Sequence, residues 1–448
     1  MNIIKSVVQL SLGAAFGVGM VLSCSDDSPR AEIDAGLDGH PPCTDSSQCS
    51  APTPVCDTIS MMCVQCTMAS QAISCRGTSP VCGTDDRCRA CTEHTECTIS
   101  NVCLPDGSCA DSTQVAYVQM GGAGTECTKA APCGTLDDGV RTGKSIVKMA
   151  TGIVADGKTT MIDGKTVTIV ADPGAKLGRT GPGVILSVQN DGADVRIYDL
   201  EITGSIGPTN PAISVPSGGA PRLTLTRVIV DINRGVGISA AAGVVTISRS
   251  TVSGNGGLGI SASGGTLTVS RSNVDANTGG GISISDAQFG ITNSFITRNG
   301  SGTTILGGVR IDGITVAGTH VLDFNTISAN LGPATINTGV ACGTVLVPLT
   351  FSSNIIYANI VSGGGVQVGG SPNCVTTYSD VGPDAQAGAG NINMDPMFVS
   401  PPQSNFHLMS ASPAKDVADP AATLAADFDG DVRPQGTRRD MGADEINQ

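Results

Sequence analysis

The sequence is poor in aromatic and charged side chains. It contains no Trp, 4 Tyr, 8 Phe and 4 His in 448 residues, and charged residues make up only 14%. Ordinary globular domains carry about 25% charged residues. The formal net charge of −14 argues against a nucleic-acid partner, because such a partner needs a concentrated basic surface. The 59 Gly, with abundant Thr, Ser, Val and Ile, instead favour short strands joined by tight turns.

Between Leu223 and Asp312 the sequence repeats itself every 22 residues. Each repeat contains alternating apolar residues and then an Asn, and a second short apolar segment follows a Gly. The alternation is the period of a strand and not the 3.6-residue period of a helix. A fixed period of this length predicts stacked repeats, each of which buries its apolar face only against its neighbours.

The same pattern continues on both sides of this block in longer rungs. It begins near Val195 and extends to Ile356, and irregular apolar segments between residues 146 and 188 precede it. The predicted fold class is therefore all-β, a right-handed single-stranded parallel β-helix of about nine rungs. One Asn recurs per rung, and we predict a structural ladder of amides that bond to one another and to the backbone. The ladder residues are Asn233, Asn255, Asn277, Asn299, Asn330 and Asn359.

Two cysteine pairs and one helix start are expected within this region. Cys127 and Cys133 are close enough in sequence to close a small loop by a disulfide. Cys342 and Cys374 are 32 residues apart, which is close to the local rung length, so they are expected to lie one above the other at a separation compatible with a disulfide. Thr135, with an acidic residue three positions later, predicts the start of a short helix that covers the first rung.

The first 23 residues contain one positive charge, Lys5, and then a Gly- and Ala-rich apolar run, as in a secretory signal peptide. The segment that ends at Cys24 resembles a bacterial lipobox, which implies that Cys24 is diacylated and becomes the new N-terminus. Ser25 fits the outer-membrane branch of that resemblance. A plain cleaved signal peptide and an uncleaved anchor are the alternatives. Residues 24–42 are acidic and contain Pro and Gly, so we predict a lipidated flexible tether.

Residues 43–110 contain twelve Cys in three units of four. A segment this short, with few large apolar side chains, cannot support itself by core burial, so we predict a disulfide-bonded repeat module whose pairing the sequence does not give. The alternative is zinc, because Cys63 and Cys66, like Cys88 and Cys91, have the spacing of ligand pairs. Disulfides are favoured because these pairs straddle unit boundaries. The units resemble the Cys-rich repeats of some Gram-negative surface lipoproteins, which implies a spacer or interaction module.

The repeat region and the end of the chain together resemble right-handed parallel β-helix proteins of the pectate-lyase-like superfamily. The last segment looks like the closing segment of bacterial β-helix surface proteins. The resemblance implies a β-helix with an N-terminal cap over residues 115–392, and a C-terminal cap over residues 393–448. The residues of the last segment that carry the resemblance include Asp427, Asp429, Gly430, Arg433, Asp440, Gly442 and Glu445.

Arg227, Arg249 and Arg271 also recur every 22 residues, at an outward position beside the core. Like charges stacked this closely repel strongly unless they are solvated. A solvent-exposed face is therefore the simpler interpretation of this arginine column. The alternative is a groove that binds a polyanion, such as an acidic polysaccharide.

The sequence lacks the patterns that the superfamily's enzymes need. Uronide lyases combine a calcium-binding carboxylate cluster with an Arg or Lys base, and hydrolases use close Asp groups. Here the Asp residues are scattered through the rungs, and His320 is the only His within them. Asp427, Asp429 and Asp431 do not form an EF-hand, because Arg438 stands where the loop requires Glu. We therefore expect no catalytic residue, no metal and no cofactor, with calcium at this turn as the alternative.

The expected function is that of an exported lipoprotein of the outer membrane or cell surface, held to the membrane by its lipid anchor. Its β-helix rod is expected to have a structural or adhesive role and to contact a polysaccharide or a surface protein. The alternative is a polysaccharide lyase or glycoside hydrolase with a divergent site on the loops of the long rungs, where sites commonly lie. These loops are near residues 205–222, 300–319 and 331–348.

Overall fold

The structure is a computed structural model that describes residues 42–301, 306–332, 338–361 and 367–447. The expected signal peptide, Cys24 and most of the tether lie outside the described residues. In the part of the chain that is described, no helix is both long and apolar enough to cross a membrane. The chain divides into two compact units, Met1–Ser74 with Cys82–Cys88, and Cys75–Val81 with Arg89–Gln448.

Disulfides hold the smaller unit together, because it contains little regular structure. Every Cys in the described residues is disulfide-bonded. Cys63 and Cys66 bond to different partners, which contradicts the zinc alternative for this pair. The disulfides given by the structure within this unit are Cys43–Cys56, Cys49–Cys63 and Cys66–Cys82. The short elements of this part of the chain are η1 (Ser46–Gln48), β1 (Val55–Asp57), β2 (Met62–Val64), α1 (Gln71–Ser74), β3 (Val81–Cys82) and β4 (Cys88–Arg89).

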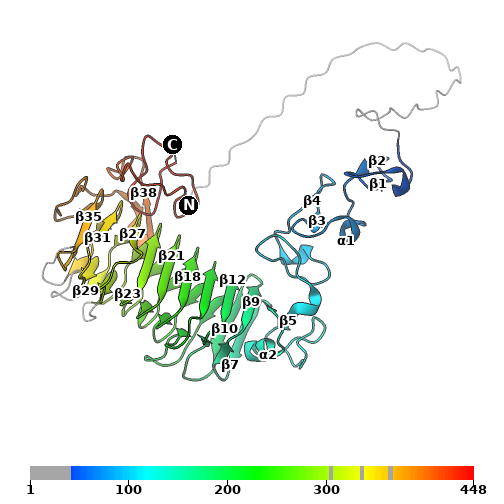
Figure 1. Ribbon diagram of the computed structural model, residues 1–448, viewed down its shortest axis with the longest axis horizontal. Helices are drawn as coiled ribbons and strands as arrows, with labels where there is room; N and C mark the ends of the chain where they lie inside the picture. The colour runs from blue at the N-terminus through cyan, green and yellow to red at the C-terminus, as the bar shows by residue number, and fades with distance from the viewer. Residues whose placement is uncertain (1–41, 302–305, 333–337, 362–366, 448) are drawn as a thin grey trace, which may run out of the picture. The chain divides into compact units, whose positions relative to one another are not determined.

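Three parallel sheets form a β-helix in the larger unit, and Figure 1 shows their strands stacked in chain order from cyan to orange. The first sheet contains β5 (Val115–Val118), β6 (Ile146–Met149), β9 (Thr166–Ala171), β12 (Asp194–Tyr198), β15 (Arg222–Thr226), β18 (Val244–Ser248), β21 (Thr266–Ser270), β24 (Gln288–Thr292) and β27 (His320–Asp323). The second contains β7 (Gly152–Asp156), β10 (Ala175–Arg179), β13 (Glu201–Thr203), β16 (Ile229–Asp231), β19 (Thr251–Ser253), β22 (Asn273–Asp275), β25 (Phe295–Thr297), β28 (Thr326–Ser328), β32 (Ile355–Tyr357) and β36 (Asp380–Gly382).

The third sheet completes each turn of the chain. It contains β8 (Thr160–Asp163), β11 (Leu186–Gln189), β14 (Ile213–Val215), β17 (Ile238–Ala240), β20 (Leu258–Ala262), β23 (Gly280–Ser285), β26 (Val309–Asp312), β30 (Val340–Cys342) and β34 (Val368–Gly370). Two further parallel pairs accompany the last turns, β29 (Leu331–Gly332) with β33 (Ile360–Val361), and β31 (Leu349–Ser352) with β35 (Cys374–Thr377). The chain thus makes about nine turns, which confirms the predicted all-β parallel β-helix.

The 22-residue period sets the register of the sheets. Leu223 pairs with Val245, which pairs with Leu267, so equivalent residues of successive repeats stack directly. Their side chains point inward and are fully buried. The interior is therefore filled by columns of apolar side chains, each of which contacts its counterparts in the turns before and after it.

The turn between the first and second sheets contains a residue in the left-handed conformation, and the arginine column occupies this position. The φ angles are 55° at Arg227, 50° at Arg249 and 50° at Arg271. This conformation costs a residue with a Cβ about 1–2 kcal/mol. The backbone nevertheless keeps its bonds, since the N–H of Arg249 donates to the carbonyl of Ser270 in the next turn.

The N-terminal opening of the β-helix is covered by α2 (Leu136–Arg141), where Leu136 and Val140 are buried in the main core. Thr135 begins this helix, because its hydroxyl accepts a hydrogen bond from the N–H of Asp138 at 3.1 Å. The amide of Asp138 would otherwise be unpaired in the first turn.

The last four cysteines of the module, at residues 91–109 and called here the third cysteine unit, belong to the same compact part of the chain as the β-helix. Val102 and Ala110 pack against Val115 and Tyr117 of β5, and the Tyr117 hydroxyl donates to the carbonyl of Ser100 at 2.6 Å. This differs from the sequence-based division, which assigned all of residues 43–110 to one separate module. The unit contains η2 (His94–Glu96) and the disulfides Cys91–Cys103 and Cys97–Cys109, and η3 (Ser112–Gln114) leads into β5.

The C-terminal segment lies along the side of the last turns (Figure 1). Leu408 and Met441 pack with Phe324 and Ile355, which point outward from the β-helix. The stack of parallel strands ends where Ile392 bridges to Asp380 of β36. The predicted C-terminal cap, residues 393–448, is the segment that follows. The segment lies at the side because it buries the outward apolar residues of the last turns, and removing apolar surface from water is favourable. Its elements are β37 (Phe398–Ser400), η4 (Pro401–Gln403) and β38 (Asn405–Leu408).

Candidate functional site

The structure brings the six predicted ladder Asn into one buried column. The Nδ2 group of Asn255 donates to Oδ1 of Asn277 at 2.8 Å and to the carbonyl of Val230 at 3.0 Å. Oδ1 of Asn255 accepts from both the backbone N–H and the Nδ2 group of Asn233. Each amide therefore bonds to its neighbours and to the backbone. At the end of the column, Gln367 bonds to Asn359 in the same way.

A second column of polar side chains lies beside the turn between the first and second sheets, and it was not predicted from the sequence. The N–H of Ser250 donates to the hydroxyl of Ser272, and the N–H of Ser294 donates to Oδ1 of Asn325. Its only signal in the sequence is a Ser that recurs every 22 residues, at Ser250, Ser272 and Ser294, before Asn takes this position in the later turns. Its members are Ser250, Ser272, Ser294, Asn325, Asn354, Ser379 and Asn391.

The two cysteine pairs expected in the β-helix are bonded. Cys127–Cys133 closes a loop next to β5, and Cys342–Cys374 joins the third sheet to the following turn. Their Cα atoms are 4.7 and 6.6 Å apart. The Cys342–Cys374 disulfide therefore links two successive turns.

The three arginines of the column have three different environments. Arg227 forms a two-point ion pair with Asp199, with distances of 2.6 and 2.8 Å. Nε of Arg271 donates to the carbonyl of Phe428 in the C-terminal segment at 3.0 Å. Arg249 is exposed, and its guanidinium has no hydrogen-bond or ion-pair partner among the described residues. The column is therefore not one continuous cationic groove.

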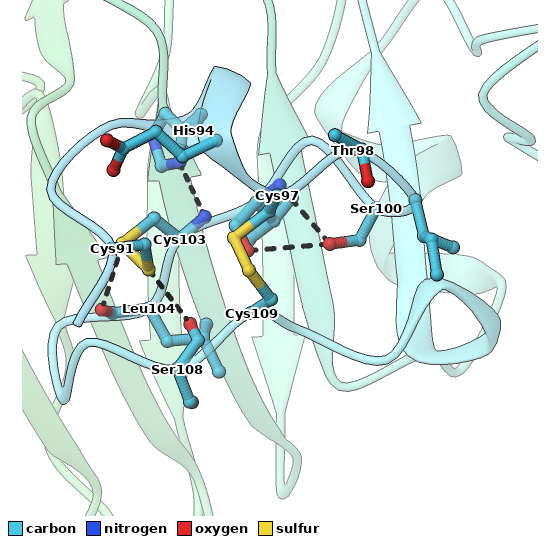
Figure 2. The surroundings of a disulfide bond; sticks show 12 residues. Cys91, His94, Cys97, Thr98, Ser100, Cys103, Leu104, Ser108 and Cys109 are labelled. Carbon is cyan, nitrogen blue, oxygen red and sulfur yellow. Dashed lines mark hydrogen bonds between the residues drawn. A yellow bond between two sulfur atoms is a disulfide. The ribbon is translucent and has the colours of Figure 1, made fainter. Parts of the chain in front are cut away.

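A cleft of about 940 Å³ lies between the third cysteine unit and the turns that follow β9, β12 and β15. Its wall on the cysteine side includes His94, next to the Cys91–Cys103 disulfide (Figure 2). Tyr198 and Arg227 lie on the β-helix side. No sequence pattern indicated this cleft, because it depends on how the third cysteine unit packs against the first sheet.

Hydrogen bonds fix the protonation of His94 at the cleft wall. Its Nδ1 accepts from the backbone N–H of Cys103 at 3.0 Å (Figure 2), and its Nε2 faces the carbonyl of Ala171 at 3.3 Å. Nε2 therefore carries the proton of the neutral ring. Burial lowers the pKa of His94, and the positive charge of Lys148 lowers it further. The imidazole is thus neutral near pH 7.

Carboxylates dominate the charge of the cleft. Glu93, Asp106, Asp172 and Asp199 line it, and Arg227 is the only Lys or Arg among the described residues of the lining. Asp172 is paired with Lys148 and Asp199 with Arg227, so Glu93 and Asp106 give the lining a net negative charge that disfavours a polyanion. Carboxylates accept hydrogen bonds from hydroxyl groups and attract cations, so a ligand rich in hydroxyl or amino groups fits this lining better.

The outer face of the second sheet contains a Lys with two nearby carboxylates. Nζ of Lys176 bonds to Oε1 of Glu201 at 2.6 Å, and this bond raises the pKa of Lys176. Burial and the charge of Glu201 raise the pKa of Asp231. A catalytic Lys base needs a lowered pKa, so this arrangement keeps Lys176 protonated and does not supply a base.

Parts of the long-rung loops near residues 300–319 and 331–348 lie outside the described residues. In the described part, His320 and Asp286 border a cavity of about 330 Å³. The ring of His320 lies 5.2 Å from that of Phe289, and its Nε2 is 3.4 Å from the carbonyl of Val316. Asp312 accepts a hydrogen bond from Arg310, which lowers the pKa of Asp312. A general acid needs a raised pKa, so Asp312 is not prepared for that role.

Asp427 holds together the turn that contains Asp429 and Asp431, for which a calcium site was the alternative hypothesis. Its Oδ1 accepts from the N–H groups of Gly430 and Asp431, and its Oδ2 accepts from the N–H of Glu445. Both oxygens are thus used by backbone donors at distances of 2.8 to 3.0 Å. Asp427 therefore acts as a structural residue of the C-terminal segment.

Asp380, which is buried, and Asp323, which is partly buried, predict a pH-dependent stability. Burial and the charge of Asp395 raise the pKa of Asp380 to about 7, and burial and the charge of Asp419 raise that of Asp323 to about 6. The unfolded chain releases these protons near pH 4. At a pH between the unfolded-state and folded-state pKa values, unfolding therefore releases protons. The free energy of unfolding should fall as the pH rises from about 4 to about 7.

The test is urea unfolding at pH 5 and pH 8 for the parent and for Asp380→Asn. The variant should be more stable than the parent at pH 8, because its side chain cannot ionise, and the gap should shrink at pH 5. Equal pH profiles for the two proteins would contradict the assignment to Asp380.

The comparisons with known proteins agree with the fold described above. Residues 234–393 match a family model described as the right handed beta helix region. The fold is a right-handed parallel β-helix. A similar solved structure is the crystal structure of the pectate lyase Pel9A, with a TM-score of 0.55 and 16% identity over 75% of this chain and 99% of that one. No curated protein matches the sequence.

Proposed function

We propose that this β-helix protein binds a neutral or basic glycan through the cleft and does not cleave it. The observation that carries the proposal is the lining of the cleft, which contains four carboxylates, the ring of Tyr198 and the paired Arg227. Carboxylates and Arg bond to sugar hydroxyls, and an aromatic ring offers an apolar face.

The fold similarity to a pectate lyase supports a carbohydrate-related role, but the chemistry of this chain favours binding. A uronide substrate is anionic, and the cleft has more carboxylates than cations. Lys176 is held protonated by Glu201, which argues against base catalysis on the second sheet. Polysaccharide cleavage by a lyase or hydrolase is the second candidate, and the same experiment tests it.

The experiment is a glycan array, with affinities measured by calorimetry for the neutral and the amino-sugar polymers that score. Tyr198→Leu keeps the apolar volume but removes the ring, and it should weaken binding about tenfold, which corresponds to about 1.4 kcal/mol. Arg249→Ala is the matched control, because it changes an exposed side chain away from the cleft lining, and it should bind like the parent.

A uronate-release assay on the same protein separates the two candidates. Release of unsaturated products from a uronide polymer would contradict the binding proposal. Retention of polyanions alone, abolished by Arg249→Glu, would instead favour the arginine column as the binding surface.

We further propose that the protein is exported and anchored to the outer membrane or cell surface through Cys24. The disulfide bonding of every Cys in the described residues supports export, because disulfides persist in oxidising compartments. Mass spectrometry of the mature protein should show a diacylated Cys24 as the first residue. An intact Met1 or an unmodified Cys24 would contradict the anchor.

A further inference from the structure

Three side chains from separate parts of the C-terminal segment meet at one place. His407 lies on β38, Asp429 in the turn after Asp427, and Asp444 near the end of the chain. One potential ligand atom of each lies within 4.8 Å of those of the other two. Nε2 of His407 is 2.9 Å from Oδ2 of Asp429.

The hydrogen bonds of Asn405 determine which nitrogen of His407 carries a proton. Oδ1 of Asn405 accepts from the backbone N–H of His407 at 3.1 Å, and Nδ1 of His407 is 2.7 Å from the same oxygen. Nδ1 must therefore be the protonated donor. In the neutral ring, Nε2 then presents a lone pair to a carboxylate oxygen at 2.9 Å. Two acceptors at this distance repel, unless a metal ion or a second ring proton lies between them.

The surroundings provide excess negative charge and little to balance it. Asp444 is buried, and its carboxylate accepts from the N–H of Leu408 at 2.7 Å. The negative charges of Asp427 and Asp429 act on the same carboxyl group. The buried Arg433 guanidinium is engaged by Glu445 and by backbone carbonyls.

We propose that His407, Asp429 and Asp444 bind one divalent transition-metal ion, for which zinc is the best match. One imidazole and two carboxylates are typical zinc ligands, whereas calcium and magnesium prefer oxygen alone. A metal-bound His commonly donates its other N–H to an oxygen acceptor, as His407 does to Asn405. The side chains of His407 and Asp429 are 34% and 49% exposed, so water can complete the coordination.

The ion would join β38, the turn at Asp429 and the end of the chain, all of which lie beside the last turns of the β-helix. The ring of His407 is 5.2 Å from that of Phe295 on β25, so the site would also fix the segment to the second sheet. The proposal is independent of glycan binding in the cleft.

The experiment starts from the full-length chain after treatment with a chelator. Zinc chloride is titrated by calorimetry, and the melting temperature is measured with and without the ion. We expect one zinc per chain and a higher melting temperature, and cobalt(II) should give a visible absorption spectrum that depends on His407. Asn405→Ala should weaken zinc binding about 10- to 100-fold, because it releases the ring from its orientation.

His407→Gln and Asp429→Asn should abolish this binding. Asp429 is half exposed, so its substitution leaves the fold intact and keeps the test valid if His407→Gln is unstable. Asp431→Asn is the matched control and should bind zinc like the parent. Absence of zinc uptake, or uptake that survives Asp429→Asn, would overturn the proposal. Stabilisation through His407 only at acidic pH, without zinc uptake, would instead indicate an imidazolium–carboxylate ion pair and would also overturn it.

Discussion

Asn255→Ala is expected to lower the free energy of unfolding by about 3 kcal/mol or more. The side chain is fully buried and makes bonds to Asn233, Asn277 and the carbonyl of Val230. Its removal leaves several buried polar groups without partners, at about 1–3 kcal/mol each. Equilibrium unfolding in urea measures the loss, and hydrogen exchange should show faster opening at the turns that contain Asn233 and Asn277.

The matched control for this prediction is Arg249→Ala, in the same repeat. Its guanidinium has no partner among the described residues, so the change should be within about 0.5 kcal/mol of the parent. Equal free energies of unfolding for Asn255→Ala and Arg249→Ala would contradict the prediction that the buried Asn column stabilises the fold.

Arg433→Met is expected to destabilise the C-terminal segment by about 3–5 kcal/mol. The side chains of Arg433 and Glu445 are 0% and 1% exposed, and they form an ion pair of 3.2 Å. Removing one partner of a buried pair leaves an uncompensated charge, which is the costly case. The guanidinium also lies 4.9 Å from the ring centroid of Phe324. Limited proteolysis should therefore cleave residues 394–447 in the variant before the β-helix.

A second substitution tests the cause of that loss. Glu445→Gln in the Arg433→Met background removes the orphaned charge and should recover part of the stability. Arg222→Met, at an exposed end of β15, is the control and should behave like the parent. If the double variant were no more stable than Arg433→Met, the loss would have to come from packing and not from charge.

The regular part of the fold could be predicted from sequence because each turn repeats the same local requirements. Leu223 and Leu225 alternate, and Val230 and Asn233 follow at fixed intervals, so a single period gives strand position, inward face and ladder. Each column consists of equivalent residues from successive repeats, and stacking of the repeats brings these residues into contact.

The cleft and the C-terminal packing could not be predicted in the same way. Both depend on non-repeating segments that meet the β-helix from outside, and a period carries no information about them. For the packing of the C-terminal segment, the sequence does contain one signal. Phe295 and Ile355 occupy outward strand positions at which the alternation requires polar residues, and these residues are buried by the C-terminal segment. An apolar residue on the outward face of a strand therefore predicts a covering segment.

The fixed register of the repeats also bears on how this protein can change in evolution. The lining of the cleft reaches as far as Arg227, and Arg271 donates a hydrogen bond to the C-terminal segment. Between them, Val245 and Leu267 are stacked partners in an uninterrupted ladder. Duplication of one 22-residue unit in this interval would give each new residue the neighbours that its template already has. Tandem duplication could therefore lengthen the β-helix between the cleft and the C-terminal segment by one turn at a time. The surfaces of the cleft and of the C-terminal segment would stay unchanged.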